Sequence, residues 1–162
     1  MSRLFLSTAL SGLFITTAAF AGTDMVSVID VTIDLPAVTN KAAALRYTHI
    51  SDDLKNAITS RLVDRLAPDG EKVGVDISEV ELSNSFTEIT GAADTKLVGI
   101  VSITDVKDNS NFKSYTLSVD INQAKGFFPA TIDMTTLKAS SDEYYQAMIQ
   151  AFAAAVVERL AS

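Results

Sequence analysis

The stretch Ser51–Ile77 reads SDDLKNAITSRLVDRLAPDGEKVGVDI and carries the signals of a helix, a turn and a strand. In its first half apolar residues recur every four positions, which predicts one helical stripe made of Leu54, Ile58, Leu62 and Leu66. Ser51 can cap this helix, and the two carboxylates that follow it meet the positive helix end. A turn at Pro68–Gly70 stops the helix. The next strand opens with alternating valines and continues to about Leu82, with a change of phase near Ser78.

On the N-terminal side a strand is predicted from Met25 to Leu35. From Ile29 onwards apolar and polar residues alternate, which leaves one face of the strand in water. Val26 and Val28 fall on the other phase, and either a bulge near Val28 or a strand end buried on both sides would explain them. Because a helix separates this strand from the next one, the two can pair in parallel.

On the C-terminal side two more strands and a helix are predicted. Leu97–Ile103 is apolar on both phases, which indicates a central strand covered on much of both faces. Asp108–Asn111 has the composition of a hairpin turn, and the alternating run Tyr115–Ile121 follows it as a half-buried strand. The last helix begins with a capping box of Ser140 and Glu143. Its apolar face is made of Tyr145, Met148, Ile149, Phe152, Val156 and Leu160.

The predicted order of elements is therefore β-α-β-β-β-α. Two amphipathic helices on one face of a mostly antiparallel four-stranded sheet bury every apolar stripe, so the predicted fold class is α+β, a two-layer sandwich. Residues 40–50, which include an Ala-rich run, fit either a helix or a loop. The element order is similar to that of small accessory domains in the envelope assembly and export machines of Gram-negative bacteria. This resemblance rests on element order and assigns no residues.

Residues 1–21 have the features of a secretory signal peptide. Arg3 supplies the positive charge, Leu4–Phe20 is apolar apart from Ser, Thr and Gly, and Ala19-Phe20-Ala21 gives the small-x-small pattern of a cleavage site. We expect cleavage after Ala21, a single domain over residues 22–162, and a periplasmic or secreted location. The alternative is a retained N-terminal membrane anchor, because the apolar run approaches the length of a membrane span.

The composition excludes several classes of function. The 162 residues include 13 Lys+Arg, 20 Asp+Glu, one His and no Cys, with a net charge of −7. Without Cys there is no disulfide, thiolate zinc site or cysteine nucleophile. The acidic balance argues against nucleic acid, because a phosphate-binding surface needs clustered Lys and Arg. We predict no cofactor, and no stable membrane insertion once the leader is removed.

No catalytic set emerges from the sequence, and we predict that the protein is not an enzyme. His49 precedes Ser51 and Asp52, but a triad is a spatial arrangement that neighbours in sequence seldom adopt. Ser110 and Lys113 match S-x-x-K on a hairpin turn, whereas serine acyl enzymes place that motif at the start of a helix.

Carboxylates offer two further hypotheses. Paired acids suffice for glycoside hydrolysis, and the candidates are Asp30, Asp34, Asp76 and Glu79, although a wet sheet face explains them equally well. Oxygen ligands for calcium gather at Asp105, Asp108, Asn109 and Asn111, but their spacing misses the EF-hand and turn chemistry explains Asp and Asn there. We therefore predict no metal site.

Two apolar features could contact a partner. The Ala-rich side of the last helix could pack on a second copy, although packing on its own sheet is simpler, and the other feature is aromatic. Phe127, Phe128 and Pro129 lie between the last strand and the last helix, and Phe86 lies in an earlier polar connection. If these residues are exposed, they would contact a partner or ligand. If Phe127 and Phe128 are buried, they would close the core or form a short strand. The leading hypothesis is a soluble, non-enzymatic accessory module that binds an envelope protein. The alternatives are a carrier of small apolar ligands and an Asp/Glu-dependent hydrolase. The sequence also allows a homo-oligomer.

Overall fold

A computed structural model describes residues 25–33, 48–81, 96–108, 110, 112–133 and 142–161. The strands are β1 (Val26–Ile33), β2 (Glu71–Glu81), β3 (Lys96–Thr104) and β4 (Phe112–Asp120). The helices are α2 (Ile50–Arg61), α4 (Ile121–Ala124) and α5 (Asp142–Arg159), with short 3₁₀ turns η1 (Val63–Arg65) and η2 (Lys125–Phe127).

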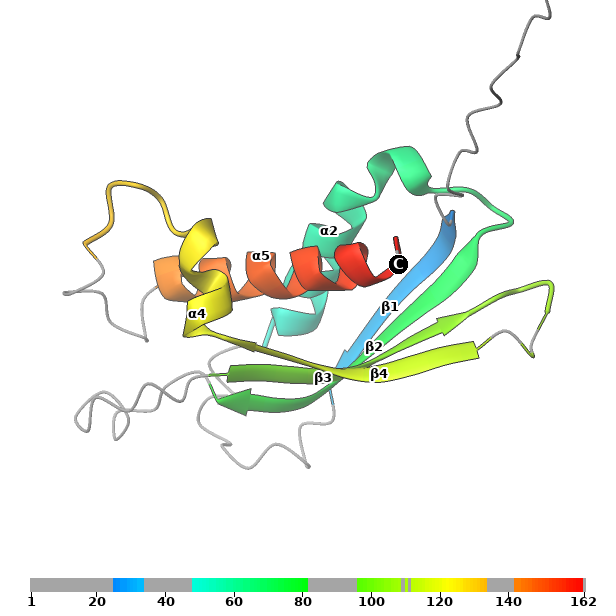
Figure 1. Cartoon of the computed structure of the whole chain (residues 1–162), viewed down its shortest axis with the longest axis horizontal. Coiled ribbons are helices and arrows are strands. Elements are labelled where there is room, and N and C mark those ends of the chain that lie inside the picture. The colour runs from blue at the N-terminus through cyan, green and yellow to red at the C-terminus, as the bar shows by residue number, and fades with distance from the viewer. Residues whose placement is uncertain are drawn as a thin grey trace, which may run out of the picture.

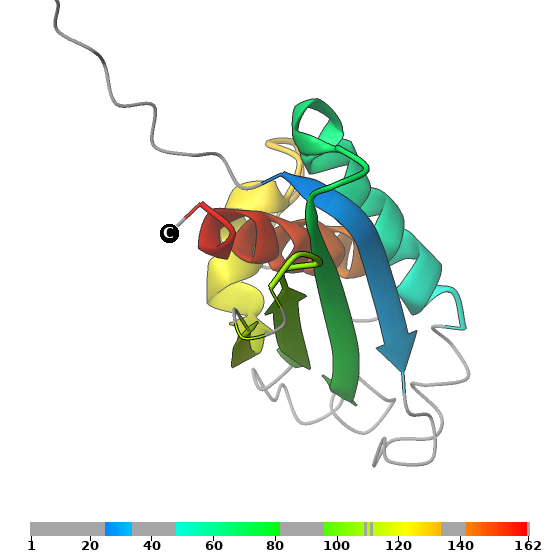
Figure 2. The same ribbon diagram turned by 90° about the vertical axis from the view of Figure 1, so that its right-hand side faces the viewer.

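The strands form one mixed sheet in the order β1-β2-β3-β4. β1 is parallel to β2, and the other two pairs are antiparallel. Figures 1 and 2 show α2 and α5 together on one face of this sheet. The predicted α+β class, the parallel first pair and the meander of the last three strands are thus confirmed.

The two predicted irregularities of the strands are also present. The register of β1 against β2 shifts between Val26 and Val28, which explains why these valines fall on a different phase from Ile29. The register of β2 against β3 shifts between Ile77 and Glu79, at the predicted change of phase near Ser78. The first shift allows both Val26 and Ile29 to be buried, while Val28 between them is exposed.

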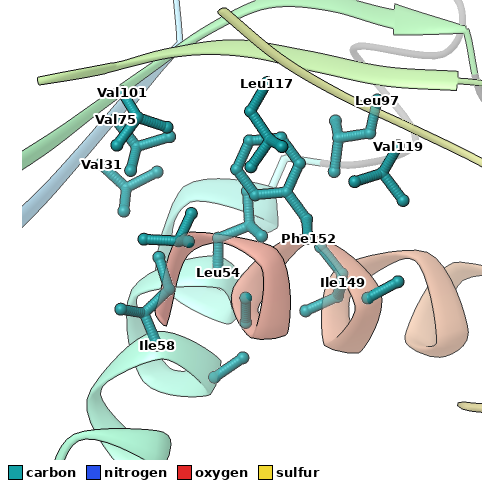
Figure 3. Close-up of a cluster of buried hydrophobic side chains, with 14 of the residues drawn as sticks. Val31, Leu54, Ile58, Val75, Leu97, Val101, Leu117, Val119, Ile149 and Phe152 are labelled. Atoms are coloured by element: carbon teal, nitrogen blue, oxygen red, sulfur yellow. The ribbon is translucent and has the colours of Figure 1, made fainter. Parts of the chain in front are cut away.

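The core lies between the sheet and the two helices. Phe152 of α5 is fully buried, and Figure 3 shows its ring directed at the sheet, close to Leu117. Leu54 and Ile58 of α2 meet it from the side, as the predicted stripe requires. Gly99 of β3 makes room for the ring, because a Cβ there would lie 3.1 Å from Phe152 Cζ. The packing of the Phe152 ring on β3 therefore depends on a residue without a side chain.

Three details of the helices differ from the predictions. α2 begins at Ile50, so Ser51 lies inside its first turn, and His49 stands at the cap position with no side-chain hydrogen bond. The helix ends at Arg61, and Leu66, predicted to continue its stripe, is exposed and pairs with Val26 in an isolated bridge. The reason is the short turn η1, which takes the chain off the helical path before Leu66.

The other differences concern β3 and β4. One face of β3 is buried, whereas the other face is only half-buried and Ile100 on it is 45% exposed. Ile121, predicted as the end of the last strand, instead begins the short helix α4. Leu117 and Val119 of β4 are buried, as their alternation predicts. The predictions for Leu35, Ser140 and residues 40–47 lie outside the described residues.

Candidate functional site

The predicted contact segment follows β4 through a tight change of direction. Asp120 ends β4 and caps α4, since its Oδ1 accepts hydrogen bonds from the N–H groups of Asn122 (2.8 Å) and Gln123 (3.1 Å). The side-chain oxygen of Gln123 accepts the N–H of Asp120 in return, at 2.8 Å. This capping box turns the chain out of the sheet. It places η2 against α5.

We call Phe127, Phe128 and Pro129 the aromatic corner. Both rings are half-buried against the core, while Pro129 is exposed. The guanidinium carbon of Arg61 lies 5.5 Å from the centre of the Phe127 ring, within cation–π range. The ring of Phe128 is tilted at 59° to that of Tyr144, with 5.9 Å between the ring centres. Phe86, the fourth predicted contact residue, lies outside the described residues.

Polar contacts between α2 and α5 hold the helices beside the aromatic corner. The Arg61 Nη2 donates a hydrogen bond to Gln150 Oε1 at 3.0 Å, so one guanidinium joins α2, α5 and the Phe127 ring. At the other end of α2, the hydroxyl of Tyr145 donates to Asp53 Oδ2 at 2.6 Å. These bonds fix the angle between the helices. They therefore limit the freedom of the aromatic corner.

The acidic candidates lie on the sheet face that the helices leave uncovered, which we call the open face. Asp30 pairs with Gly74 and Asp76 pairs with Thr32, so the two carboxylates are diagonal neighbours. Both are exposed, and Thr32 Oγ1 lies 3.4 Å from Asp76 Oδ1. Asp34 and the side chain of Glu79 lie outside the described part. Within the described residues both carboxylates are open to solvent, whereas hydrolytic sites exclude water to strengthen the effect of their charges.

The remaining polar candidates behave as turn residues. Asp105 Oδ1 accepts the N–H of Lys107, and Asp108 Oδ1 accepts the N–H of Ser110, both as Asx turns. The hydrogen bonds from Ser110 lower the pKa of Asp108. His49 is exposed. Across the described ranges no three His, Cys, Asp or Glu residues come together in a way that could hold a metal ion.

The environment of Tyr115 was missed by sequence reasoning. Tyr115 of β4 has its hydroxyl buried without a hydrogen-bond partner, and burial raises its pKa although the nearby Arg159 acts in the opposite direction. Arg159 lies over the Tyr115 ring, 5.0 Å from its centre. The open face itself was expected, because the sequence predicts a strand with one face in water and both helices on the other side of the sheet. The sequence did not show that this face continues over β3, where Ile100 pairs with Thr116 and Ser102 pairs with Ser114. No local sequence signal marks the environment of Tyr115.

The comparisons with known proteins give a likeness of fold. No family model matches the sequence, and no curated protein does. Among solved structures, the PelC dodecamer from Paraburkholderia phytofirmans is 11% identical, with a TM-score of 0.49, over 86% of this chain and 89% of that one. A protein from Xanthomonas campestris of family DUF330 is 12% identical, with a TM-score of 0.43, over 85% of this chain and 84% of that one. We assign no residue a role from these likenesses.

None of the helices in the described part has the length and apolar character needed to cross a membrane.

Proposed function

We propose that this chain is an exported protein of the cell envelope that acts by binding another envelope protein, without catalysis. The sequence supports export through the leader at residues 1–21 and the small-x-small pattern that ends at Ala21. The observation that carries the binding proposal is the aromatic corner. Its two adjacent rings are held between α2 and α5 and are still partly exposed.

Such rings are suited to protein recognition. Aromatic residues, Phe included, and Arg are enriched at the cores of protein interfaces, and a ring that is already fixed loses little entropy on binding. Phe127 and Phe128 are fixed by Arg61 and Tyr144, so a partner would meet a preformed surface. Pro129 beside them is exposed and keeps the surface rigid.

The alternatives have less support. A carrier of apolar ligands needs space between its layers, but the described space between helices and sheet is occupied by side chains such as Phe152, Leu54 and Ile149. A hydrolase would have to work with Asp30 and Asp76 on an open, flat face. The filled core therefore does not favour a carrier, and the exposed carboxylates do not favour a hydrolase.

Site-specific photo-crosslinking in cells tests the binding proposal. A photoreactive amino acid is placed at Gly126 or at Pro129, both exposed, in the full chain with a C-terminal tag. The matched control is the exposed Asn56 of α2. We expect one or two specific envelope proteins at the first two positions and none at Asn56. Equal products at all three positions, or none at any, would refute the aromatic corner as the contact.

Two further measurements test the identity of the partner and the export of the domain separately. A crosslink to a second copy of the chain would identify the partner as the protein itself and make the homo-oligomer the functional unit. Protease added to cells with a permeabilised outer membrane should digest the tagged domain if it has been exported. A domain that is protected until the cells are lysed would refute export, whatever the crosslinks show.

A further inference from the structure

Exposed apolar side chains are concentrated at one end of the molecule. Among the described residues, all the large apolar side chains that are markedly exposed lie there except Ile100. We call this set the apolar end, and it consists of Met25, Val28, Val63, Leu66, Val106 and Phe112. Phe112 is 57% exposed and Val63 65%. Single exposed apolar residues are normal, whereas several gathered on one surface mark a contact site.

The topology brings these residues together from four elements. β1 and β2 start at this end, because the N–H of Glu71 donates to the carbonyl oxygen of Met25 at 2.7 Å. Leu66 is joined to the start of β1 through its bridge with Val26. The β3–β4 hairpin reaches the same end, and Figure 1 shows it beside the start of β1 at the right of the molecule.

Two further contacts confirm this placement. The ladders connect Val28 through Lys72 and Thr104 to Phe112, so both apolar residues belong to one row across the sheet. The ammonium of Lys107 lies 2.9 Å from Asp69 Oδ2, which ties the hairpin to the loop before β2. Figure 2 looks onto this end.

The expected leader joins the fold at the same end. Only four residues separate Phe20, the last residue of the apolar run, from Met25. An extended chain covers about 3.5 Å per residue, so Phe20 and Met25 can be no more than roughly 17 Å apart. A headgroup layer is about 5–8 Å thick, whereas a domain of this size is roughly 35 Å across. With the leader in a membrane, the end that carries Met25 must be the near one.

We infer that the apolar end contacts the surface of the lipid bilayer as long as the leader is attached. The inference rests on the proposed export, because the tether is the leader. Apolar contact is the expected mode of binding. Asp69 and Lys107 neutralise each other at this end, and the chain as a whole is acidic, which disfavours attraction to anionic lipid. The aliphatic and aromatic side chains would lie at headgroup level, as on interfacial surfaces.

The absence of Cys from the chain allows a direct test. Single substitutions Val63→Cys, Val106→Cys and Phe112→Cys each receive an environment-sensitive dye in the full chain, reconstituted in phosphatidylcholine–phosphatidylethanolamine vesicles. Ile100→Cys is the matched control, since Ile100 is 45% exposed and Val106 is 42% exposed. Thermal unfolding of each labelled protein checks that the fold is intact, which is expected at exposed positions.

We expect the dye at Val63, Val106 and Phe112 to shift to the blue in vesicles and to be quenched by lipids that carry a nitroxide. The dye at Ile100 should keep its emission in water. An equal shift at Ile100, or no shift at any position, would overturn the inference. Because the vesicles contain no partner protein and no export machinery, these outcomes do not depend on the crosslinking and protease results that test the proposed function.

Discussion

Replacing Gly99 by Ala tests the packing of α5 on the sheet. A Cβ at this position would lie 3.1 Å from Phe152 Cζ, 3.1 Å from the carbonyl oxygen of Asp76 and 3.2 Å from Ile77 Cδ1. The carbonyl belongs to the neighbouring strand and cannot move far, whereas the end of Ile77 can rotate. The Phe152 ring is fully buried and has neighbours on all sides. The new methyl group must therefore push α5 away from β3.

The expected magnitude follows from two opposing effects. Ala in place of Gly in a strand gains about 0.5–1 kcal/mol from the lower entropy of the unfolded chain. Overpacking a filled core costs about 1–3 kcal/mol. The middle values of these ranges leave a net loss of about 1 kcal/mol for Gly99→Ala, which lowers the Tm of a domain of this size by roughly 3–5 °C.

A double-mutant cycle with Phe152→Leu identifies the cause. Leu removes the Cζ atom, so Gly99→Ala should cost about 0.5–1 kcal/mol less in the Phe152→Leu background than in the parent. The rescue should be partial, because the contact with Asp76 remains. The free energy of unfolding of residues 22–162 is measured by urea denaturation for the parent and the three variants. Strictly additive losses would refute the argument that Gly99 exists to admit the Phe152 ring.

Three further predictions concern polar groups. Tyr115→Phe should raise stability by about 1 kcal/mol, because it removes a buried hydroxyl that has no partner. Tyr145→Phe is the matched control and should lower stability by about 1 kcal/mol, because it removes the hydrogen bond to Asp53. If urea denaturation gave changes of the same sign for the two variants, the argument would be contradicted. Burial raises the pKa of Tyr115 in the folded state, so the folded state favours the protonated hydroxyl. The free energy of unfolding of the parent should therefore fall as the pH rises above about 10, and Tyr115→Phe should remove this part of the fall. Asp120→Ala should cost about 1 kcal/mol by removing the cap of α4, whereas Asp120→Asn should cost less; equal Tm values for the two would show that the cap is dispensable.

Most of the sheet could be predicted because its signals are local. Alternation with period two placed Ile29, Leu117 and Val119 on the buried face, and the phase changes in β1 and β2 marked the register shifts. β3 was harder, because its residues are apolar on both phases. Val98 and Ile100 favour a strand because they are β-branched. Their spacing gives no sign that the helices leave their face of the sheet uncovered.

The arrangement of the aromatic corner could not be predicted, since it depends on distant partners. The sequence identified Phe127 and Phe128 as neighbours of interest, but nothing near them points to Arg61 or Tyr144. The bond between Tyr145 and Asp53 joins residues 92 positions apart. α4 was missed for a different reason. Its four residues are too few for a periodic signal, and the capping box from Asp120 to Gln123 is its only mark.

The position of α5 after all four strands in the sequence affects the order in which the protein can fold. β1, the first described strand, needs β2 as its partner, and the sheet needs Phe152, Met148 and Val156 of α5 to complete its core. A chain that is still emerging from a ribosome lacks these side chains until residues 148–156 have been made. Long-range contacts of this kind delay folding. The core between the sheet and the helices can therefore close only once α5 is available to pack on it.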